Sequence, residues 1–168
     1  PAAAVAEIKA KANFDPQRIL EIEAEVRHDV IAFLTNVNEY VGDAGRYIHL
    51  GMTSSDVLDT ALALQLVASL DLILARLADV IAAIRKQAQQ HRHTVAIGRS
   101  HGIHAEPITF GFKLAGWLAE VLRHQERLTR MREEIAVGKI SGAVGTYANI
   151  EPRVEAIACA KLGLKPDT

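Results

Sequence analysis

The sequence predicts an all-α fold in which long helices pack side by side as a bundle. Ala and Leu dominate the chain, which is 49% hydrophobic but only 5% aromatic. This composition is typical of packed helices rather than of a β-sandwich. Apolar residues recur at helical spacings of three and four over most of the 168 residues. We find no internal repeat and no credible strand in the sequence.

The first helices have clear boundaries. Residues 5–12 are compatible with a short helix, and Asp15 and Pro16 suit the cap and the first position of the next one. From Pro16 to Val37 the apolar residues keep helical spacing, so we expect a single helix with one apolar face. That face consists of Ile19, Ile22, Val26, Val30, Phe33 and Val37.

Three consecutive ionisable residues, Arg27, His28 and Asp29, fall within this expected helix, beside its apolar face. Such a triplet usually forms a solvated edge of a helix, but it can also line a cleft. The glycines of the segment Gly42-Asp-Ala-Gly45 then interrupt the helical pattern. We therefore expect the helix to end before this segment.

A second polar cluster precedes the next helix and ends at Asp56. Thr53 or Ser54 can cap that helix, with Asp56 as the acidic end of a capping box. The free N–H groups and the positive dipole end of such a helix start also attract an anion. Capping alone accounts for these residues, while His49 and Gly51 just before them favour an additional role in binding.

The helix expected over residues 55–90 is the strongest structural prediction. Its apolar stripe is unbroken, and a second apolar face indicates that it is buried on more than one side. At ~1.5 Å per residue such a helix is roughly 50 Å long. A chain of this size does not cover that length easily, so oligomerisation or a much larger parent chain is implied. The stripe consists of Leu58, Leu62, Leu66, Leu70, Ile73, Leu77, Ile81, Ile84 and Ala88.

Three further segments complete the expected fold. The polar connection Gly98–Pro107 leads into a second long helix, which we expect to open at Pro107. Residues 138–149 form a glycine-rich loop that matches neither phosphate-binding glycine fingerprint. Pro152 then starts a last helix, and Gly163 ends it as a C-terminal cap.

The connection Gly98–Pro107 carries the densest chemistry of the sequence. It contains Arg99, Ser100, His101 and His104. A metal site at His101 and His104 lacks the helical HExxH pattern and a nearby cysteine, and a nucleophile at Ser100 lacks an elbow motif. We therefore favour a pocket for an anion, in which arginines and a helix start bind carboxylate or phosphate and a histidine moves a proton.

Charge and composition exclude several classes of partner. The chain has 19 basic and 20 acidic residues, so it lacks the basic surface of a nucleic-acid binder. The longest uncharged part of the long apolar helix, residues 60–70, is too short to span a membrane. Cys159 is the one cysteine and cannot form an internal disulfide. We expect it to be a small buried residue in a reducing, cytoplasmic compartment.

Four segments of the chain carry recognisable motifs in a specific order. They are Arg27–Phe33, His49–Asp56, Gly98–Pro107 and Gly138–Asn149. In these motifs, and over essentially its whole length, the chain resembles the adenylosuccinate lyase family, the purine-pathway branch of the fumarase/aspartase superfamily. Sister families typically carry Leu-Gln after the central histidine, where this chain has Gly-Ile-His. The one departure from the family pattern is Ser100, where threonine is usual, and the hydroxyl group is kept.

The resemblance implies an all-α bundle of the fumarase/aspartase type and a lyase without cofactors. Members of the family split adenylosuccinate into AMP and fumarate, and the succinylated carboxamide ribotide SAICAR into AICAR and fumarate, by anti β-elimination. By this resemblance His101 is the general acid that protonates the departing nitrogen. The implied substrate-binding residues, for the nucleotide and the succinyl carboxylate, are Arg27, His28, Asp29, His49, Thr53, Ser54, Arg99 and Ser100.

The resemblance also implies that the chain is part of a larger enzyme. Residues 1–52 correspond to the end of the N-terminal helical domain, and residues 53–168 to the first part of the central bundle domain. The family's catalytic serine base lies in a third conserved region that this sequence does not contain, so we expect the isolated chain to be inactive. The family is a homotetramer in which three subunits contribute to each active site.

Two alternatives remain open. The first is another fumarate-releasing lyase, of the argininosuccinate lyase or fumarase type, against which His104 and the motif at residues 27–29 argue. The second is a non-catalytic helical module that uses its long helices for oligomerisation only. In that case the histidines, Thr53 and Ser54 would tolerate substitution.

Overall fold

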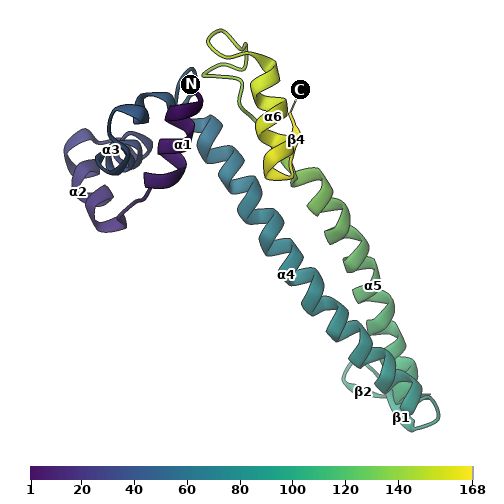
Figure 1. Cartoon of the computed structure of the whole chain (residues 1–168). Helices are drawn as coiled ribbons and strands as arrows, with labels where there is room; N and C mark the ends of the chain where they lie inside the picture. The colour runs from purple at the N-terminus through teal and green to yellow at the C-terminus, as the bar shows by residue number, and fades with distance from the viewer. Residues whose placement is uncertain (168) are drawn as a thin grey trace. The chain divides into compact units, whose positions relative to one another are not determined.

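A computed structural model describes residues 1–167 of the chain. It confirms the expected all-α class, because helices make up most of the chain (Figure 1). The chain divides into two compact units: Pro1–Thr60 together with the segment from Gly138 onward, and Ala61–Val137. Within the described residues, no helix combines the length and the apolar character needed to cross a membrane.

The first unit contains helices α1 to α3, a short 3-10 helix and the start of α4. Asp15 caps α2 as expected, since its Oδ1 accepts a hydrogen bond from Gln17 N–H at 2.9 Å, and Pro16 occupies the first helical position. The core of this unit forms where α1 and α3 pack around Val37 and Val41. The bounds are Ala2–Lys11 for α1, Pro16–Val26 for α2, Asp29–Val41 for α3, Gly42–Tyr47 for the 3-10 helix and Ser54–Gln90 for α4.

The prediction of a single helix over residues 16–37 is wrong, because the helix is interrupted at Arg27 and His28, which separate α2 from α3. Arg27 has left-handed backbone angles (φ 55°, ψ 39°), and its N–H donates to Glu23 O at 2.8 Å to close α2. His28 then caps α3, with Nδ1 accepting from Ile31 N–H. Since α2 and α3 pack against each other, both keep an inward apolar face and the helical spacing continues across the break.

Replacing Asp15 by alanine tests how strongly this cap stabilises the first unit. We expect a loss of about 1 kcal/mol in the free energy of unfolding, because the N–H groups of Gln17 and Arg18 lose their shared acceptor. Denaturant titration followed by circular dichroism measures the loss. Glu25→Ala, at an exposed position late in α2, is the control and should leave the stability unchanged. Equal stability of Asp15→Ala and the unaltered protein would contradict the cap.

In the second unit α4 continues and pairs with α5 (Phe110–Ile135), which runs antiparallel to it (Figure 1). The Arg132 guanidinium on α5 makes a two-pronged ion pair with Asp71 on α4, in which Nη2 lies 2.9 Å from Oδ2. The hydrogen bond from Arg132 lowers the pKa of the Asp71 carboxyl below its ordinary value. This pair links the two helices across their exposed side.

The long apolar stripe of α4 is only partly covered within the chain. Leu70 and Ile81 are buried, but Leu66 on the same stripe is 38% exposed and Leu72 beside it is 71% exposed. On α5, Trp117 is half exposed. Exposed apolar surface of this kind marks a site of interaction with another segment or another chain.

The connection between α4 and α5 is a β-hairpin, so the prediction that the chain contains no strand is wrong. β1 (Val95–Ser100) pairs antiparallel with β2 (Ile103–Thr109). Valine, isoleucine and threonine favour strands, but the polar residues of the motif hide their alternation in the sequence. The helix start expected at Pro107 is also wrong: this proline pairs with Ile97 in the hairpin, and α5 begins at Phe110. The last residue of β2 caps α5 through its side chain.

The segment from Gly138 onward completes the first unit. After the glycine-rich loop, α6 (Pro152–Leu162) begins with a proline at its first position, as expected. It ends at Gly163, whose left-handed φ of 71° makes it the expected C-terminal cap. Two strands of two residues each, β3 (Val137–Gly138) and β4 (Lys165–Pro166), pair with each other.

Candidate functional site

In the first unit the junction between α2 and α3 lies against the start of α4. Nε2 of His28 is 3.4 Å from Oγ of Ser54, the first residue of α4, and Nδ1 is 3.3 Å from Oδ1 of Asp29. The side chains of His28 and Asp29 are 45% and 60% exposed, and Arg27 is exposed as well. The structure thus brings two predicted motifs together and leaves their polar groups accessible to a ligand.

The turn that leads into α4 carries His49. Its Nε2 is buried and has no hydrogen-bond partner among residues 1–167. A buried polar atom without a partner is costly, so the unpaired nitrogen marks His49 as a residue that packing alone does not explain. The same turn requires glycine at position 51, where φ is +77° and a Cβ would lie 2.3 Å from Asn149 O of the glycine-rich loop.

Asp56, in the first turn of α4, is an internal anchor. Its side chain is fully buried, and its carboxylate accepts hydrogen bonds from Thr53 N–H at 2.9 Å and from Ser141 N–H at 3.1 Å. The bond from Thr53 confirms the acidic half of the expected capping box. Lys139 Nζ lies 2.8 Å from Oδ1. Burial raises the pKa of Asp56, but the Lys139 ammonium and the backbone N–H groups outweigh burial, so the pKa is lowered overall.

Further buried groups hold the glycine-rich loop. Thr60 Oγ1 accepts from Lys139 N–H at 3.1 Å, and Glu155 on α6 accepts from Ile140 N–H at 2.7 Å. Tyr147 O–H donates to the same glutamate at 2.8 Å. Because Glu155 is buried, these bonds are shielded from water and are stronger than their surface counterparts. The loop is therefore held against α4 and α6 at Lys139, Ile140 and Tyr147.

The lowered pKa of Asp56 makes stability depend on pH. The contribution of this carboxylate is present above its ordinary pKa of 3.8 and is lost as the pH falls through the lower folded-state value. We expect the difference in unfolding free energy between the unaltered protein and Asp56→Asn to be largest near neutral pH and to shrink below about pH 4. Denaturant titrations at several pH values measure this difference. A difference that does not change with pH would contradict the stabilising role of the charged Asp56 carboxylate.

In the second unit His101 occupies the turn of the β-hairpin. His101 (φ 54°) and Gly102 (φ 75°) both have left-handed backbone angles, the combination that a two-residue type I′ turn requires. Few residues other than glycine adopt this conformation. The hairpin therefore presents the His101 imidazole at an exposed tip on a backbone that carries local strain.

The strands separate the two other predicted residues of the hairpin. Arg99 pairs with His104, and Ser100 pairs with Ile103. Successive residues of a strand point to opposite faces, so Arg99 shares a face with His104 while Ser100 lies on the other face. Only one of the two can contact a ligand that binds on a given side of the hairpin.

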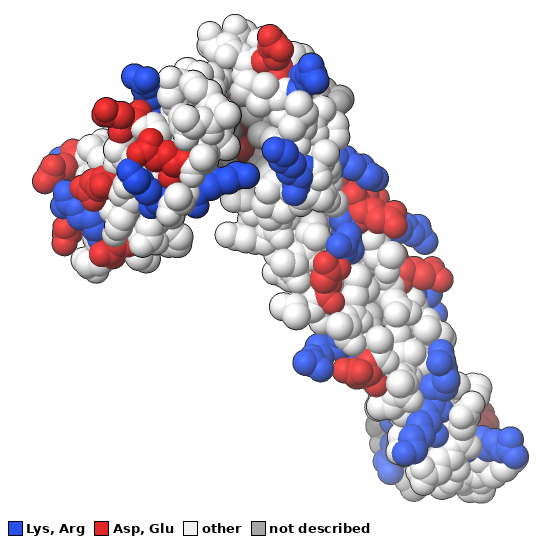
Figure 2. Space-filling view, viewed as in Figure 1, with Lys and Arg blue, Asp and Glu red and all other residues white. Residues whose placement is uncertain are grey.

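The hairpin end of the second unit is cationic. Figure 2 shows basic side chains gathered over the end of α4, the hairpin and the start of α5. Between residues 85 and 117 the basic residues are Arg85, Lys86, Arg92, Arg99 and Lys113, and the one acidic residue is Glu106. Such an excess of one sign of charge attracts anionic ligands.

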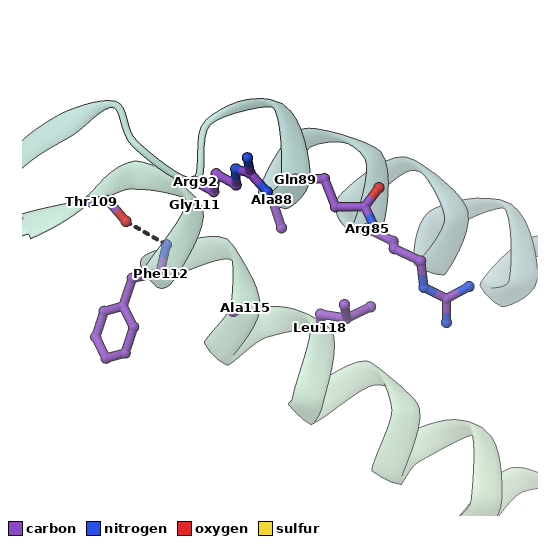
Figure 3. Close-up of a pocket in the computed structure, with 9 residues that line it drawn as sticks. All are labelled: Arg85, Ala88, Gln89, Arg92, Thr109, Gly111, Phe112, Ala115 and Leu118. Atoms are coloured by element: carbon purple, nitrogen blue, oxygen red, sulfur yellow. Dashed lines mark hydrogen bonds between the residues drawn. The ribbon is translucent and has the colours of Figure 1, made fainter.

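An open cavity of about 600 Å³ lies between the end of α4 and the start of α5 (Figure 3). Arg85 of α4 and Arg92, just after the end of α4, line one side, and Phe112 and Leu118 of α5 line the other. None of the lining residues belongs to the predicted site. The cavity therefore reflects how the two helices diverge and does not mark the predicted chemistry.

The predicted site residues fall into two groups. Arg27, His28, Asp29, His49, Thr53 and Ser54 belong to the first unit, and Arg99, Ser100 and His101 belong to the second. In the first unit the structure adds Lys139 and Glu155, which the sequence did not single out. No local pattern marks the pair of Lys139 and Asp56, because 83 residues separate its members.

The one cysteine of the chain is buried in the first unit. Cys159 is fully buried, as expected, and its Sγ lies 3.4 Å from Gly138 O. Burial raises the pKa of the thiol, which disfavours the reactive thiolate. Residues 1–167 contain no group of three or more His, Cys, Asp or Glu side chains placed to hold a metal ion.

Comparison with known proteins finds relatives over the whole chain. The chain is 84% identical, over all of its 168 residues, to the adenylosuccinate lyase of Synechocystis sp., of which it spans 39%. It is 51% identical to the adenylosuccinate lyase of Bacillus subtilis, over 94% of this chain and 37% of that protein. The chain therefore spans less than half the length of these curated relatives.

Solved structures share the fold. The fumarate lyase from Mesorhizobium sp. BNC1 matches with a TM-score of 0.92 at 34% identity, covering 99% of this chain and 41% of that one. The 3-carboxy-cis,cis-muconate lactonizing enzyme from Pseudomonas putida matches with a TM-score of 0.87 at 36% identity, covering 99% and 40%. A family described as Lyase matches residues 2–167, and from this match over nearly its whole length the chain belongs to the lyase family.

Proposed function

We propose that this chain is part of an adenylosuccinate lyase. The observation that carries the proposal is the 84% identity to an adenylosuccinate lyase over every residue of the chain, since this range includes all four motifs and every predicted site residue. The proposed reaction releases fumarate from adenylosuccinate to give AMP, and from SAICAR to give AICAR. It is an anti β-elimination that uses no metal and no organic cofactor.

His101 is the general acid of the proposed reaction. It protonates the nitrogen that departs as the C–N bond breaks, and this proton transfer stabilises the leaving group in the transition state. The hairpin supports the role, because its turn presents the imidazole at an exposed tip and its surroundings are cationic. Arg99 or Ser100 adds a substrate contact from the face of the hairpin on which the substrate lies.

The start of α4 binds a succinyl carboxylate. Thr53 and Ser54 offer hydroxyl groups and the positive end of the helix dipole. Removal of the proton next to a carboxylate builds negative charge, which such preorganised donors stabilise. The contact between His28 and Ser54 supports a shared site, because it joins the proposed nucleotide-binding motif, residues 27–29, to this helix start. His49, on the turn just before this helix start, helps to orient the substrate beside them.

The proposed enzyme is a cytoplasmic homotetramer whose active sites are shared between subunits. The apolar surface of α4 and α5 that the described residues leave exposed supports completion by further segments or copies. The family's general base is a serine of a conserved region that these 168 residues do not contain. We therefore propose that this chain by itself does not turn over substrate.

The alternatives have weaker support. The solved structures whose names give another activity share 34% and 36% identity with the chain, against 84% for the adenylosuccinate lyase. A module that only oligomerises does not account for the 84% identity to a lyase over a range that includes every predicted site residue.

The full-length protein that carries this chain tests the proposal. Fumarate release from adenylosuccinate and from SAICAR, followed by absorbance, is the expected result. Argininosuccinate serves as the matched control substrate. Release from argininosuccinate in place of the other two would replace the proposal by the alternative lyase, and no release from any substrate would favour the oligomerisation module.

A further inference from the structure

We propose that Lys139 is a positioning residue of the active site. It cancels the charge of Asp56 and fixes the glycine-rich loop beside the start of α4. The inference rests on the proposed function, in which Thr53 and Ser54 bind a succinyl carboxylate. Lys139 acts through Asp56 and the loop, since its ammonium is engaged with both.

The negative charge of Asp56 opposes the binding of a carboxylate at the start of α4. Its carboxylate is buried in the first turn of the helix whose start binds the substrate, and it accepts a hydrogen bond from Thr53 N–H at 2.9 Å. Two negative charges within one helical turn repel each other, and a buried charge is poorly screened by water. An unpaired Asp56 would therefore weaken the binding of any anionic substrate group at this helix start.

Lys139 removes this repulsion. Its ammonium lies 2.8 Å from Asp56 Oδ1, and the side chains are 25% and 0% exposed, respectively. The pair is electrically neutral, so the positive end of the α4 dipole can act on a bound carboxylate. Because Asp56 is fully buried, this pair is shielded from water more than a surface ion pair is.

The same ammonium holds one end of the glycine-rich loop. Nζ donates to Gly142 O at 2.8 Å, while Gly142 N–H donates to Asp56 Oδ2 at 3.1 Å. At the other end of the loop, Asn149 O lies so close to Gly51 that a Cβ there would be 2.3 Å away. The loop is thus fixed at both ends against the segment that carries the proposed carboxylate site.

Steady-state kinetics of fumarate release by the full-length protein tests this role. Lys139→Gln leaves Asp56 unpaired and is expected to raise KM about tenfold or more, with kcat within about threefold. Lys139→Arg keeps the charge and should keep KM close to that of the unaltered protein. The double variant D56N/K139Q removes both charges and should bind substrate better than Lys139→Gln alone. Lys161→Gln, at an exposed position on α6, is the matched control and should change nothing.

The double variant separates charge compensation from a purely structural role. A structural role makes the double variant as weak as Lys139→Gln or weaker, and that result, or an unchanged KM in a folded Lys139→Gln, would overturn the proposal. If thermal melting shows that Lys139→Gln does not fold, Lys139→Arg decides. A near-normal KM then supports the proposal, and a tenfold rise in KM of folded Lys139→Arg overturns it.

A direct binding measurement separates this inference from the proposed function. If the unaltered protein releases no fumarate, the proposed function has failed, and calorimetric titration with succinate then takes the place of KM for the same variants. Succinate binding that weakens in Lys139→Gln and recovers in the double variant supports the charge compensation by itself. Absence of that pattern in a protein that releases fumarate overturns only the role of Lys139.

Discussion

Replacing His101 by asparagine in the full-length protein is expected to lower kcat for fumarate release by about 10²- to 10⁴-fold. Asparagine tolerates the left-handed backbone that the hairpin turn imposes at this position, so the variant removes the general acid and keeps the turn. KM should change little, because the proton is transferred in the transition state and not on binding. Absorbance at saturating adenylosuccinate measures the effect.

Two further variants control this experiment. His93→Asn changes an exposed histidine just after α4 and should leave kcat unchanged. His101→Ala should lose as much activity as the asparagine variant and be about 1–2 kcal/mol less stable than that variant, because alanine, unlike asparagine, has no local hydrogen bond to offset the left-handed conformation. A kcat of His101→Asn close to that of the unaltered protein would show that another group supplies the proton.

Helix boundaries that a single side chain fixes could be predicted from the sequence. Asp15 caps α2 through N–H groups two and three residues away, and Gly163 ends α6 through its own φ of 71°. The acidic half of the capping box at Asp56 spans three residues. Each of these interactions is local, so the residue type and its place in the pattern carry the information.

Boundaries that depend on tertiary contacts could not be predicted in this way. Arg27 ends α2 in a left-handed conformation that arginine seldom adopts, and the apolar spacing gives no sign of the break. The sequence also did not predict the hairpin. A bulge between Ile97 and Arg99 shifts the pairing of its strands, and this shift breaks the strict alternation that identifies a strand.

The candidate site shows the same difference between local signals, which the sequence carries, and tertiary contacts, which it does not. The sequence motifs single out His28 and Ser54 separately, but the 3.4 Å contact between them depends on the fold. Lys139 and Asp56 show the limit most clearly. Their charges carry no signal at a separation of 83 residues, because each looks like an ordinary residue of a loop or of a helix start. Only the fold shows that they neutralise each other under the proposed carboxylate site.

A single methyl group added at Gly111 is expected to destabilise the protein strongly, because α5 approaches the end of α4 closely at this position. A Cβ at this position would lie 2.5 Å from Ala88 O and 2.6 Å from Arg92 Cα (Figure 3). Both are backbone atoms, so no side chain can rotate away and the two helices must move apart. We expect Gly111→Ala to lower the free energy of unfolding by about 3 kcal/mol, as measured by denaturant titration of the full-length protein.

Gly116 on the same helix is the matched control, since nothing lies within 4 Å of a Cβ built there. Alanine in place of glycine inside a helix is expected to stabilise by about 0.5–1 kcal/mol. Opposite signs for the same substitution at two positions of α5 separate the contact with α4 from helix propensity. A destabilising Gly116→Ala would instead show that another segment or another copy covers this face of α5. An unaffected Gly111→Ala would contradict the packing of α5 on the end of α4, and with it the position of the hairpin that carries His101.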